Sequence, residues 1–320
     1  MFNFSYNFNW KNSRAHLLLL SKFMYPREPR YYYDQENWAR VLNEPAQKSI
    51  KRFINENMLV NADLEYRVSY KYKVHELKEL LKQRGLSISG IKKELVSRIV
   101  LADRDGTSKL VADVEHLLCT QSGREIAQKY IREETDKRSK VEQQVMILLQ
   151  KKMFEGAIVE VSKYEAEQVF PRGIGIDWKR YDTKREIEIM NLIFNSKPEI
   201  MSKLEDVNLE PLQIGAAMME IWGESTATKW LPINFNTGLS LDNDTSARMF
   251  LFNAINITNL KQYRESGVVN YVEVLVTANS CDSCKKSQGK RYKINEAPIL
   301  PNPNCTNELG CRCMYLACIE

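Results

Sequence analysis

KYKVHELKELLKQRGLSISGIKKELVSRIVLAD, residues 71–103, is the stretch around which the rest of the fold is organised. Its apolar residues recur every three or four positions in two runs, as on one face of a helix: Val74, Leu77, Leu80 and Leu81, then Ile91, Leu95, Val96, Ile99 and Val100. Gly85 stands where the first helix should end, because glycine readily adopts the left-handed conformation of helix C-termini. Ser89-Gly90 indicates a turn that opens the second helix. The sequence therefore predicts two short helices, joined by an extended segment, around one small core.

The same stretch carries the excess positive charge of the chain. Residues 67–104 contain ten Lys or Arg and four acidic residues, a net charge of +6, whereas the whole chain has a net charge of +5. Such a concentration of cations is typical of a segment that binds phosphates. The alternative is a solvated helical hairpin whose lysines only keep it soluble.

The order of residues in this stretch resembles the SAP motif, a helix–extended loop–helix module of DNA-binding proteins. The matching pattern is L-x-x-L-L-x-x-x-G-L followed by S-G-x-K-x-x-L-x-x-R-I, within residues 72–103. The resemblance implies that the N-terminus of the second helix and its lysines lie against the DNA backbone and recognise groove shape more than bases. The expected partner is double-stranded DNA, and the expected contact residues are Lys73, Lys78, Lys82, Arg84, Ser89, Gly90, Lys92, Lys93 and Arg98.

Six of the seven cysteines lie in the last 40 residues, and in a reducing compartment such clustering indicates a metal before it indicates disulfides. An apolar run, residues 268–276, predicts a strand that leads to Cys281 and Cys284, whose C-x-x-C spacing lets two thiolates meet on one cation. Cys305 supplies a third thiolate, and Cys311 and Cys313 compete for the fourth position. The spacing predicts a structural Zn²⁺ site, with free thiols or regulated disulfides as the alternatives.

The cysteine region also resembles the C-terminal part of phage Mu F-like head morphogenesis proteins. The shared features are an R-x-x-x-N-x-x-N-like run from Arg248 to Asn256, the C-x-x-C pair, the Gly289-Lys290 turn and the final C-R-C. Asn302 stands where that family has histidine, and residues 306–310 are inserted before the C-R-C. Membership would imply a minor capsid component that is made with the portal and works near packaged DNA.

The fold class predicted for the whole chain is mainly α and multidomain, with a small α+β zinc-stapled domain at the C-terminus. Hydrophobic residues make up 43% and charged residues 27% of the chain, which is ordinary for a globular protein. The first ten residues alternate aromatic and polar side chains, as in a β-strand, which would be either an edge strand of the protein's own sheet or an arm that docks on another subunit. The predicted segments are an aromatic arm 1–35, a helical domain 36–135 containing the module 72–103, a helical middle domain 136–262 and a zinc-binding domain 263–320.

Residues that would support catalysis are sparse. His16, His75 and His116 lie in separate N-terminal segments, none is near the cysteine cluster in the sequence, and no P-loop, G-x-S-x-G or H-E-x-x-H motif occurs. Neither a secretory signal nor an apolar run of 18 residues is present, which favours a cytoplasmic protein of a prokaryote or phage, or a protein of the virion. We therefore expect a non-enzymatic DNA-binding protein. The alternatives are a head morphogenesis protein that contacts the capsid or portal through its N-terminal arm and C-terminal domain, and a DNA-processing nuclease.

Overall fold

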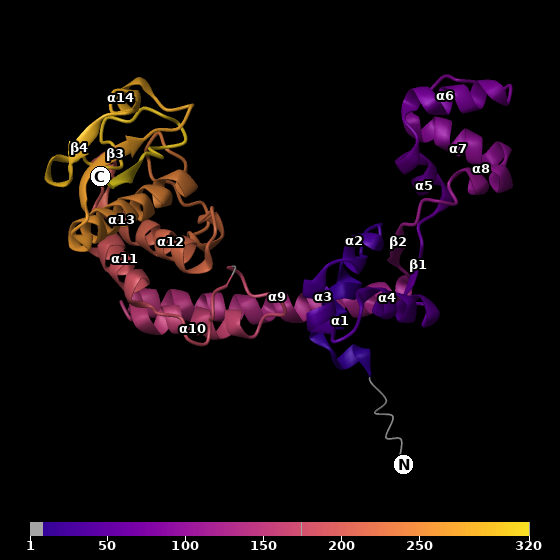
Figure 1. The fold of residues 1–320 in the computed structure, drawn as a ribbon, viewed down its shortest axis with the longest axis horizontal. Coiled ribbons are helices and arrows are strands. Elements are labelled where there is room, and N and C mark those ends of the chain that lie inside the picture. Colours follow the sequence, from indigo (N-terminus) through magenta and orange to yellow (C-terminus); the bar gives the residue numbers. More distant parts are fainter. Residues whose placement is uncertain (1–8, 174, 320) are drawn as a thin grey trace, which may run out of the picture. The chain divides into compact units, whose positions relative to one another are not determined.

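The computed structural model describes residues 9–173 and 175–319, and this part of the chain is mostly helical, as the sequence predicts. The chain divides into two compact units, residues 1–137 and 138–320. The longest helix, α9 (Gln121–Gln150), begins in the first unit and ends in the second (Figure 1). No helix among the described residues is long and apolar enough to cross a membrane.

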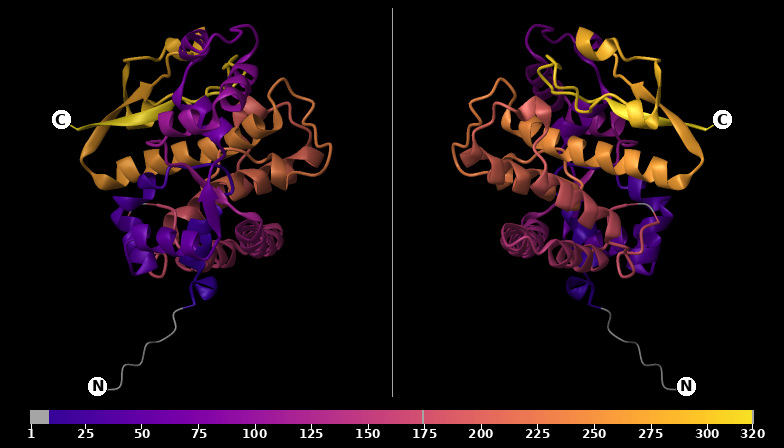
Figure 2. Two further views of the ribbon diagram at one scale, coloured as in Figure 1. Left: turned by 90° about the vertical axis from the view of Figure 1, so that its right-hand side faces the viewer. Right: turned by 90° about the vertical axis from the view of Figure 1, so that its left-hand side faces the viewer.

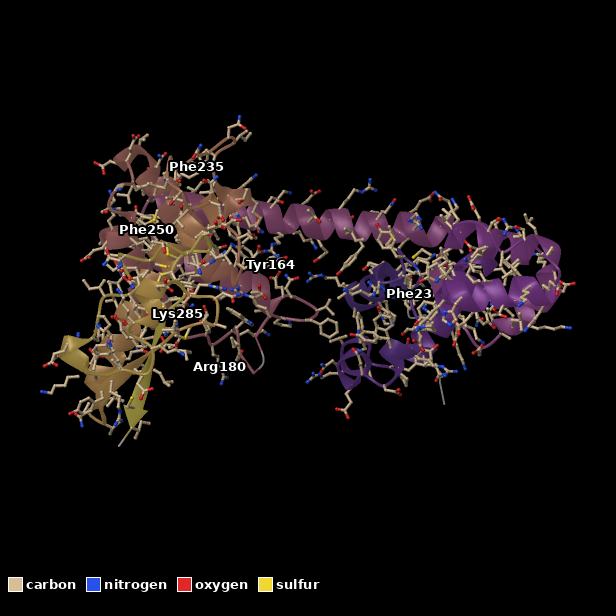
Figure 3. All side chains as sticks on the ribbon, turned by 90° about the horizontal axis from the view of Figure 1, so that it is seen from above. Phe23, Tyr164, Arg180, Phe235, Phe250 and Lys285 are labelled. Carbon is tan, nitrogen blue, oxygen red and sulfur yellow. The ribbon has the colours of Figure 1, made fainter. Side chains whose placement is uncertain are left out.

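The first unit begins with short helices around an aromatic core, in which Phe23 is fully buried (Figure 3). Trp10 lies in a 3₁₀ helix, Trp10–Asn12, and not in the predicted strand, because its ring packs edge-on against Phe53 with 4.8 Å between centroids. Its indole Nε1 also donates to Glu56 over 2.9 Å. Residues 1–8 of the predicted strand lie outside the described residues. The helices are α1 (Arg14–Ser21), α2 (Arg30–Tyr33), α3 (Glu36–Leu42) and α4 (Ala46–Asn55).

A two-stranded antiparallel sheet separates this helical part from residues 64–110, which contain the basic stretch and are called the basic module below. Strands β1 (Leu59–Asn61) and β2 (Leu117–Cys119) pair with Leu59 opposite Cys119. Cys119 is buried, and burial raises the pKa of its thiol to about 11. The module lies between these two strands in the sequence. Their pairing therefore brings the two ends of the module together.

Four helices surround the core of the basic module: α5 (Leu64–Lys71), α6 (Val74–Gln83), α7 (Lys92–Ala102) and α8 (Arg104–Leu110). Leu77, Leu81, Leu95 and Ile99 are fully buried, which confirms the two predicted helices and their shared core. The flanking helices α5 and α8 also supply core residues, among them Val68 and Val111. Because the two predicted helices are short, these extra apolar contacts add burial that the central stretch does not contain.

The second unit is a helical bundle that packs against a three-stranded antiparallel sheet in the order β4-β3-β5. Strand β3 (Val269–Leu275) confirms the strand expected before the cysteines. Its Val272 and Val274 are buried. Helix α13 lies beside the sheet (Figure 2). The remaining elements are α10 (Phe154–Ala166), α11 (Lys184–Asn195), α12 (Leu209–Trp222), α13 (Asn243–Ser266), α14 (Asp282–Lys285), β4 (Arg291–Lys293) and β5 (Met314–Ile319).

One apolar core runs through this whole unit. The boundary proposed at residue 262 lies inside α13, whose buried Met249, Phe250 and Ala254 belong to the same core as Val272 of the sheet. The helix contacts both α12 and the strands β3 and β5. The cysteine region is therefore supported by the helical bundle, and α13 is the element that joins them.

Candidate nucleic-acid interface and metal centre

Acidic side chains at the start of each helix set the geometry of the basic module. The Glu76 carboxylate accepts the backbone N–H of Lys73 over 2.6 Å at the start of α6, and the Glu94 carboxylate accepts that of Ile91 over 3.1 Å at the start of α7. An acid in the first turn satisfies a free N–H group and complements the helix dipole. Helix α7 therefore begins at Lys92, after the predicted Ser89-Gly90 turn, and the exposed turn lies immediately before its N-terminus.

Five of the expected contact residues are lysines, and none of the five forms an ion pair with a residue that the structure describes: Lys73, Lys78, Lys82, Lys92 and Lys93. Three of them are exposed, and Lys78 and Lys92 are half-buried. A lysine with no internal partner keeps its charge available for an external anion, and its long side chain can reach that anion over an apolar surface. The lysines are thus the cations that the module offers to a partner.

The two arginines of the expected contact set are held inside the module. Arg98 donates to the backbone carbonyls of Ser87 and Ser89, the latter over 3.0 Å. Arg84 donates to the carbonyl of Leu80 over 3.1 Å and lies 4.0 Å from the Asp103 carboxylate. Arg98 therefore holds the extended segment against α7, and Arg84 closes the end of α6. Sequence reasoning could not show this, because backbone carbonyl acceptors leave no residue pattern.

Gly90 is expected to tolerate no side chain. Its φ is +113°, and an added Cβ would lie 2.1 Å from the Glu94 carboxylate that caps α7. We expect Gly90→Ala to destabilise the module by about 1–3 kcal/mol, through backbone strain and a displaced cap. Amide hydrogen exchange of residues 92–100 measures the effect. Gly85→Ala is the matched control, because φ is +67° there but nothing lies within 4 Å of the added Cβ. Equal protection in the two variants would contradict the role given to the cap.

The structure brings together all five cysteines predicted to bind the metal. They form two triads that share Cys284, one with Cys281 and Cys305 and the other with Cys311 and Cys313, and within each triad the sulfurs lie within 4.8 Å of one another. The Sγ atoms of Cys281 and Cys305 are 3.7 Å apart, and those of Cys284 and Cys311 are 3.9 Å apart. Zn–S bonds of about 2.3 Å in a tetrahedron place sulfurs about 3.8 Å apart. These two separations are those of thiolates that share one metal ion, so the clustered cysteines could hold a metal.

Neighbouring N–H groups stabilise the thiolate forms. Asn302 donates its backbone N–H to Cys311 Sγ over 3.2 Å and its side-chain amide to Cys284 Sγ over 3.5 Å. A hydrogen bond from Cys313 and the N–H groups of Cys313 and Asn302 hold the pKa of Cys311 well below its usual value, in spite of burial. Burial raises the pKa of Cys281, but backbone N–H groups of Cys284 and Thr306 outweigh it and bring the pKa to about 6. Thiolates are the forms that bind metals, so Cys281 and Cys311 favour a cation. Burial has the opposite effect on two other thiols: it raises the pKa of Cys284 to about 11 and also raises the pKa of Cys305.

The histidines occupy positions unlike those of a catalytic base. The ring of His16 contacts Ser13 Oγ over 2.8 Å and the Glu44 carboxylate over 3.2 Å, but only 1% of His16 is exposed, so a substrate could not reach it. Its contacts tie α1 to the start of α4. His75 is exposed on α6, and His116 is buried beside Tyr70, with 4.2 Å between ring centroids. All three belong to the first unit, whereas the five clustered cysteines belong to the second.

Two short packed helices, an extended connection held by an arginine, and lysines that form no ion pair with a described residue are the features of a small helix–extended loop–helix module. Comparison with protein families agrees, because residues 71–104 match the model of the SAP domain. The match confirms the expected resemblance of residues 72–103, and the chain contains a SAP domain. The comparisons do not show the resemblance of the cysteine region to phage head morphogenesis proteins. Neither the curated proteins nor the solved structures gave a match to this chain.

Proposed function

We propose that this protein binds double-stranded DNA without catalysing a reaction, and that the SAP domain makes the contact through phosphates. The observation that carries the proposal is the set of five lysines on the matched module that have no ion-pair partner among the described residues. Lys92 and Lys93 lie in the first turn of α7, where the helix dipole and free N–H groups also favour an anion. Ser89 and Gly90 are exposed directly before that turn and let a backbone approach closely.

In this proposal the two arginines act by positioning the contact segment. Arg98 holds the carbonyls of the loop that contains Ser89, so its loss would let the loop move away from α7. Lys73, Lys78 and Lys82 extend the positive surface along α6. Because lysine contacts phosphates as a point charge, binding should depend weakly on base sequence.

The proposal is tested by fluorescence anisotropy with labelled duplexes of unrelated sequence, in a series of salt concentrations. If all five lysines release counterions, the logarithm of the association constant should fall with the logarithm of the salt concentration with a slope of about −4 to −5. Duplexes of different sequence should give similar slopes and affinities. A protein that binds no duplex at low ionic strength would refute the proposal.

We further propose that the thiol cluster holds one structural Zn²⁺ through Cys281, Cys284, Cys305 and Cys311. Cys311 is preferred to Cys313 as the fourth ligand, because it lies 3.9 Å from Cys284 and accepts the Asn302 N–H. Cys313 would then act from outside the coordination shell, as a hydrogen-bond donor to Cys311. A zinc ion at this point would tie α14 to the loop before β5, where the described chain has little regular structure.

A phage head morphogenesis protein is the second candidate. Its support is the resemblance of the cysteine region to the Mu F-like pattern. Asn302 departs from that pattern, which has histidine there, and its side-chain amide donates to Ser283 and Cys284. This candidate predicts a large ring or a portal-bound form in size-exclusion chromatography with light scattering, whereas a DNA-binding protein of the cytoplasm should elute as a small species. Plasmid DNA left intact by the protein in magnesium or manganese would exclude the third candidate, a nuclease.

A further inference from the structure

A cavity of about 350 Å³ lies in the second unit, between α10, α12 and the segment that leads to α11. Its size falls in the range of about 300–1,000 Å³ that is usual for small-molecule sites. Ile158, Val161 and Ile221 supply aliphatic surface, and Trp178 and Tyr181 supply aromatic surface. A ligand that fits this lining needs an apolar body.

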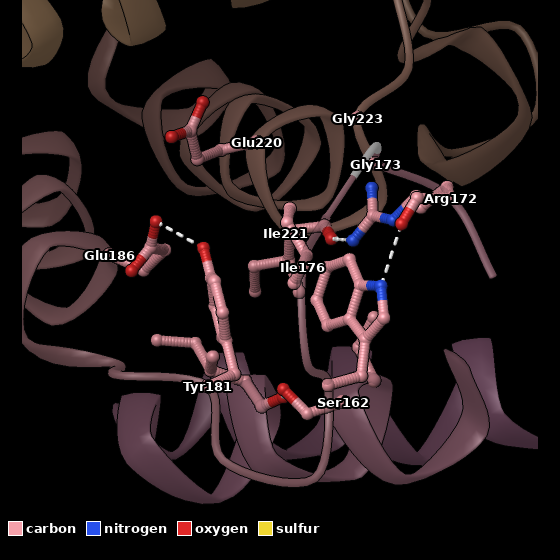
Figure 4. Close-up of a pocket in the computed structure, with 12 residues that line it drawn as sticks. Ser162, Arg172, Gly173, Ile176, Tyr181, Glu186, Glu220, Ile221 and Gly223 are labelled. Carbon is pink, nitrogen blue, oxygen red and sulfur yellow. Dashed lines mark hydrogen bonds between the residues drawn. The ribbon is translucent and has the colours of Figure 1, made fainter. Parts of the chain in front are cut away.

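Two carboxylates give the cavity its chemical character. Figure 4 shows Glu186 and Glu220 on one side, with the Tyr181 hydroxyl directed at Glu186. That hydroxyl donates to Glu186 Oε1 over 2.6 Å, but Glu186 Oε2 is buried and accepts no hydrogen bond from any described residue. The side chain of Glu220 is 17% exposed, and its ion pair with Arg185 has a separation of 4.0 Å. A buried carboxylate oxygen without a donor is costly, so these groups favour a ligand that donates hydrogen bonds.

The one arginine that lines the cavity forms its close ion pair with a different acid. Arg172 lies on the other side in Figure 4, and its Nε is 3.1 Å from the buried carboxylate of Glu165. It also donates to the carbonyl of Ile221, and its guanidinium lies over the ring of Trp178, 5.0 Å from the centroid. Since Arg172 is already paired, the cavity keeps an excess of negative charge.

We propose that this cavity binds a small organic cation, a primary ammonium group carried on an apolar or aromatic body. The ammonium would donate to the carboxylates of Glu220 and Glu186, while the body would lie against the aliphatic and aromatic walls. Burial, and to a lesser extent Glu186, raise the pKa of Glu220, although Arg185 and Arg172 oppose the shift. A bound cation would offset both effects. This site is independent of the SAP domain.

The two carboxylates give the proposal a distinctive signature. Burial disfavours the charged form of a carboxylate that has no close donor, and a neutral amide of similar shape avoids that cost. We therefore expect Glu220→Gln to retain or raise the melting temperature of the free protein and at the same time to weaken cation binding by about tenfold or more. A purely structural carboxylate would show the reverse, a loss of stability with no effect on binding.

Isothermal titration calorimetry of the full chain with phenethylammonium tests the proposal, with 2-phenylethanol as the neutral ligand of similar shape. The wild type and Glu210→Gln, a control at an exposed position of α12, should bind one ammonium per chain and no alcohol. Glu220→Gln and Glu186→Gln should both bind more weakly, and the amide at position 186 can still accept the Tyr181 hydrogen bond. Equal binding of the alcohol, unchanged affinity in both glutamine variants, or no saturable binding by the wild type would overturn the proposal.

Discussion

Replacing Cys284 by serine is expected to abolish metal binding and to lower the free energy of unfolding of the second unit by several kcal/mol. Cys284 is the thiol common to both triads, so its loss leaves neither triad complete. Structural zinc contributes about 10 kcal/mol or more of binding free energy in small zinc domains, and this energy is coupled to folding. The second unit also has an apolar core of its own, so part of its stability should survive without the metal.

Metal content measured by mass spectrometry and thermal unfolding followed by circular dichroism provide the test. Cys318→Ser is the matched control, because Cys318 lies in β5 outside both triads and should keep the metal and the melting temperature. Comparison of Cys311→Ser with Cys313→Ser identifies the fourth ligand, since only the loss of a ligand should release the ion. Wild-type protein that is folded and free of metal as purified would exclude the zinc site.

Reversing the charge of Lys92 and Lys93 should weaken duplex binding by about 100-fold at moderate salt. Both residues lie in the first turn of α7 and form no ion pair with a described residue. Glutamates at these positions would remove two phosphate contacts and add repulsion, and the dependence of affinity on salt should become shallower by about 2 in slope. The loss should be the same for duplexes of different sequence.

The control for this pair is Lys51→Glu with Lys140→Glu, which changes the net charge equally at exposed positions of α4 and α9. If binding depended only on the general attraction between protein and DNA, both double variants would bind DNA more weakly to the same extent. That result would count against a local contact. Anisotropy titrations of the two pairs, at matched salt and with melting temperatures measured in parallel, separate the two explanations.

Much of the SAP domain and of the thiol cluster could be predicted because both are local patterns. The spacing of Leu77, Leu81, Leu95 and Ile99 encodes the buried face of each helix, and Gly85 marks the end of the first. The cysteines are few, clustered and chemically distinctive, so their spacing alone indicated that they converge. The choice between Cys311 and Cys313 remained open, because residues two positions apart near a strand can both face the same site.

The sequence by itself therefore determined a mainly helical protein with a SAP domain and a cluster of convergent thiols, since periodicity and residue type are properties of neighbouring positions. Only the tertiary structure decided that Trp10 is buried in a helical core, that α13 joins the bundle to the cysteine region, and that Arg84 and Arg98 are occupied by internal contacts. It alone also placed Glu186 and Glu220, which lie on different helices, beside one cavity. Each of these features depends on packing between residues far apart in the chain, for which a single sequence carries no spacing signal.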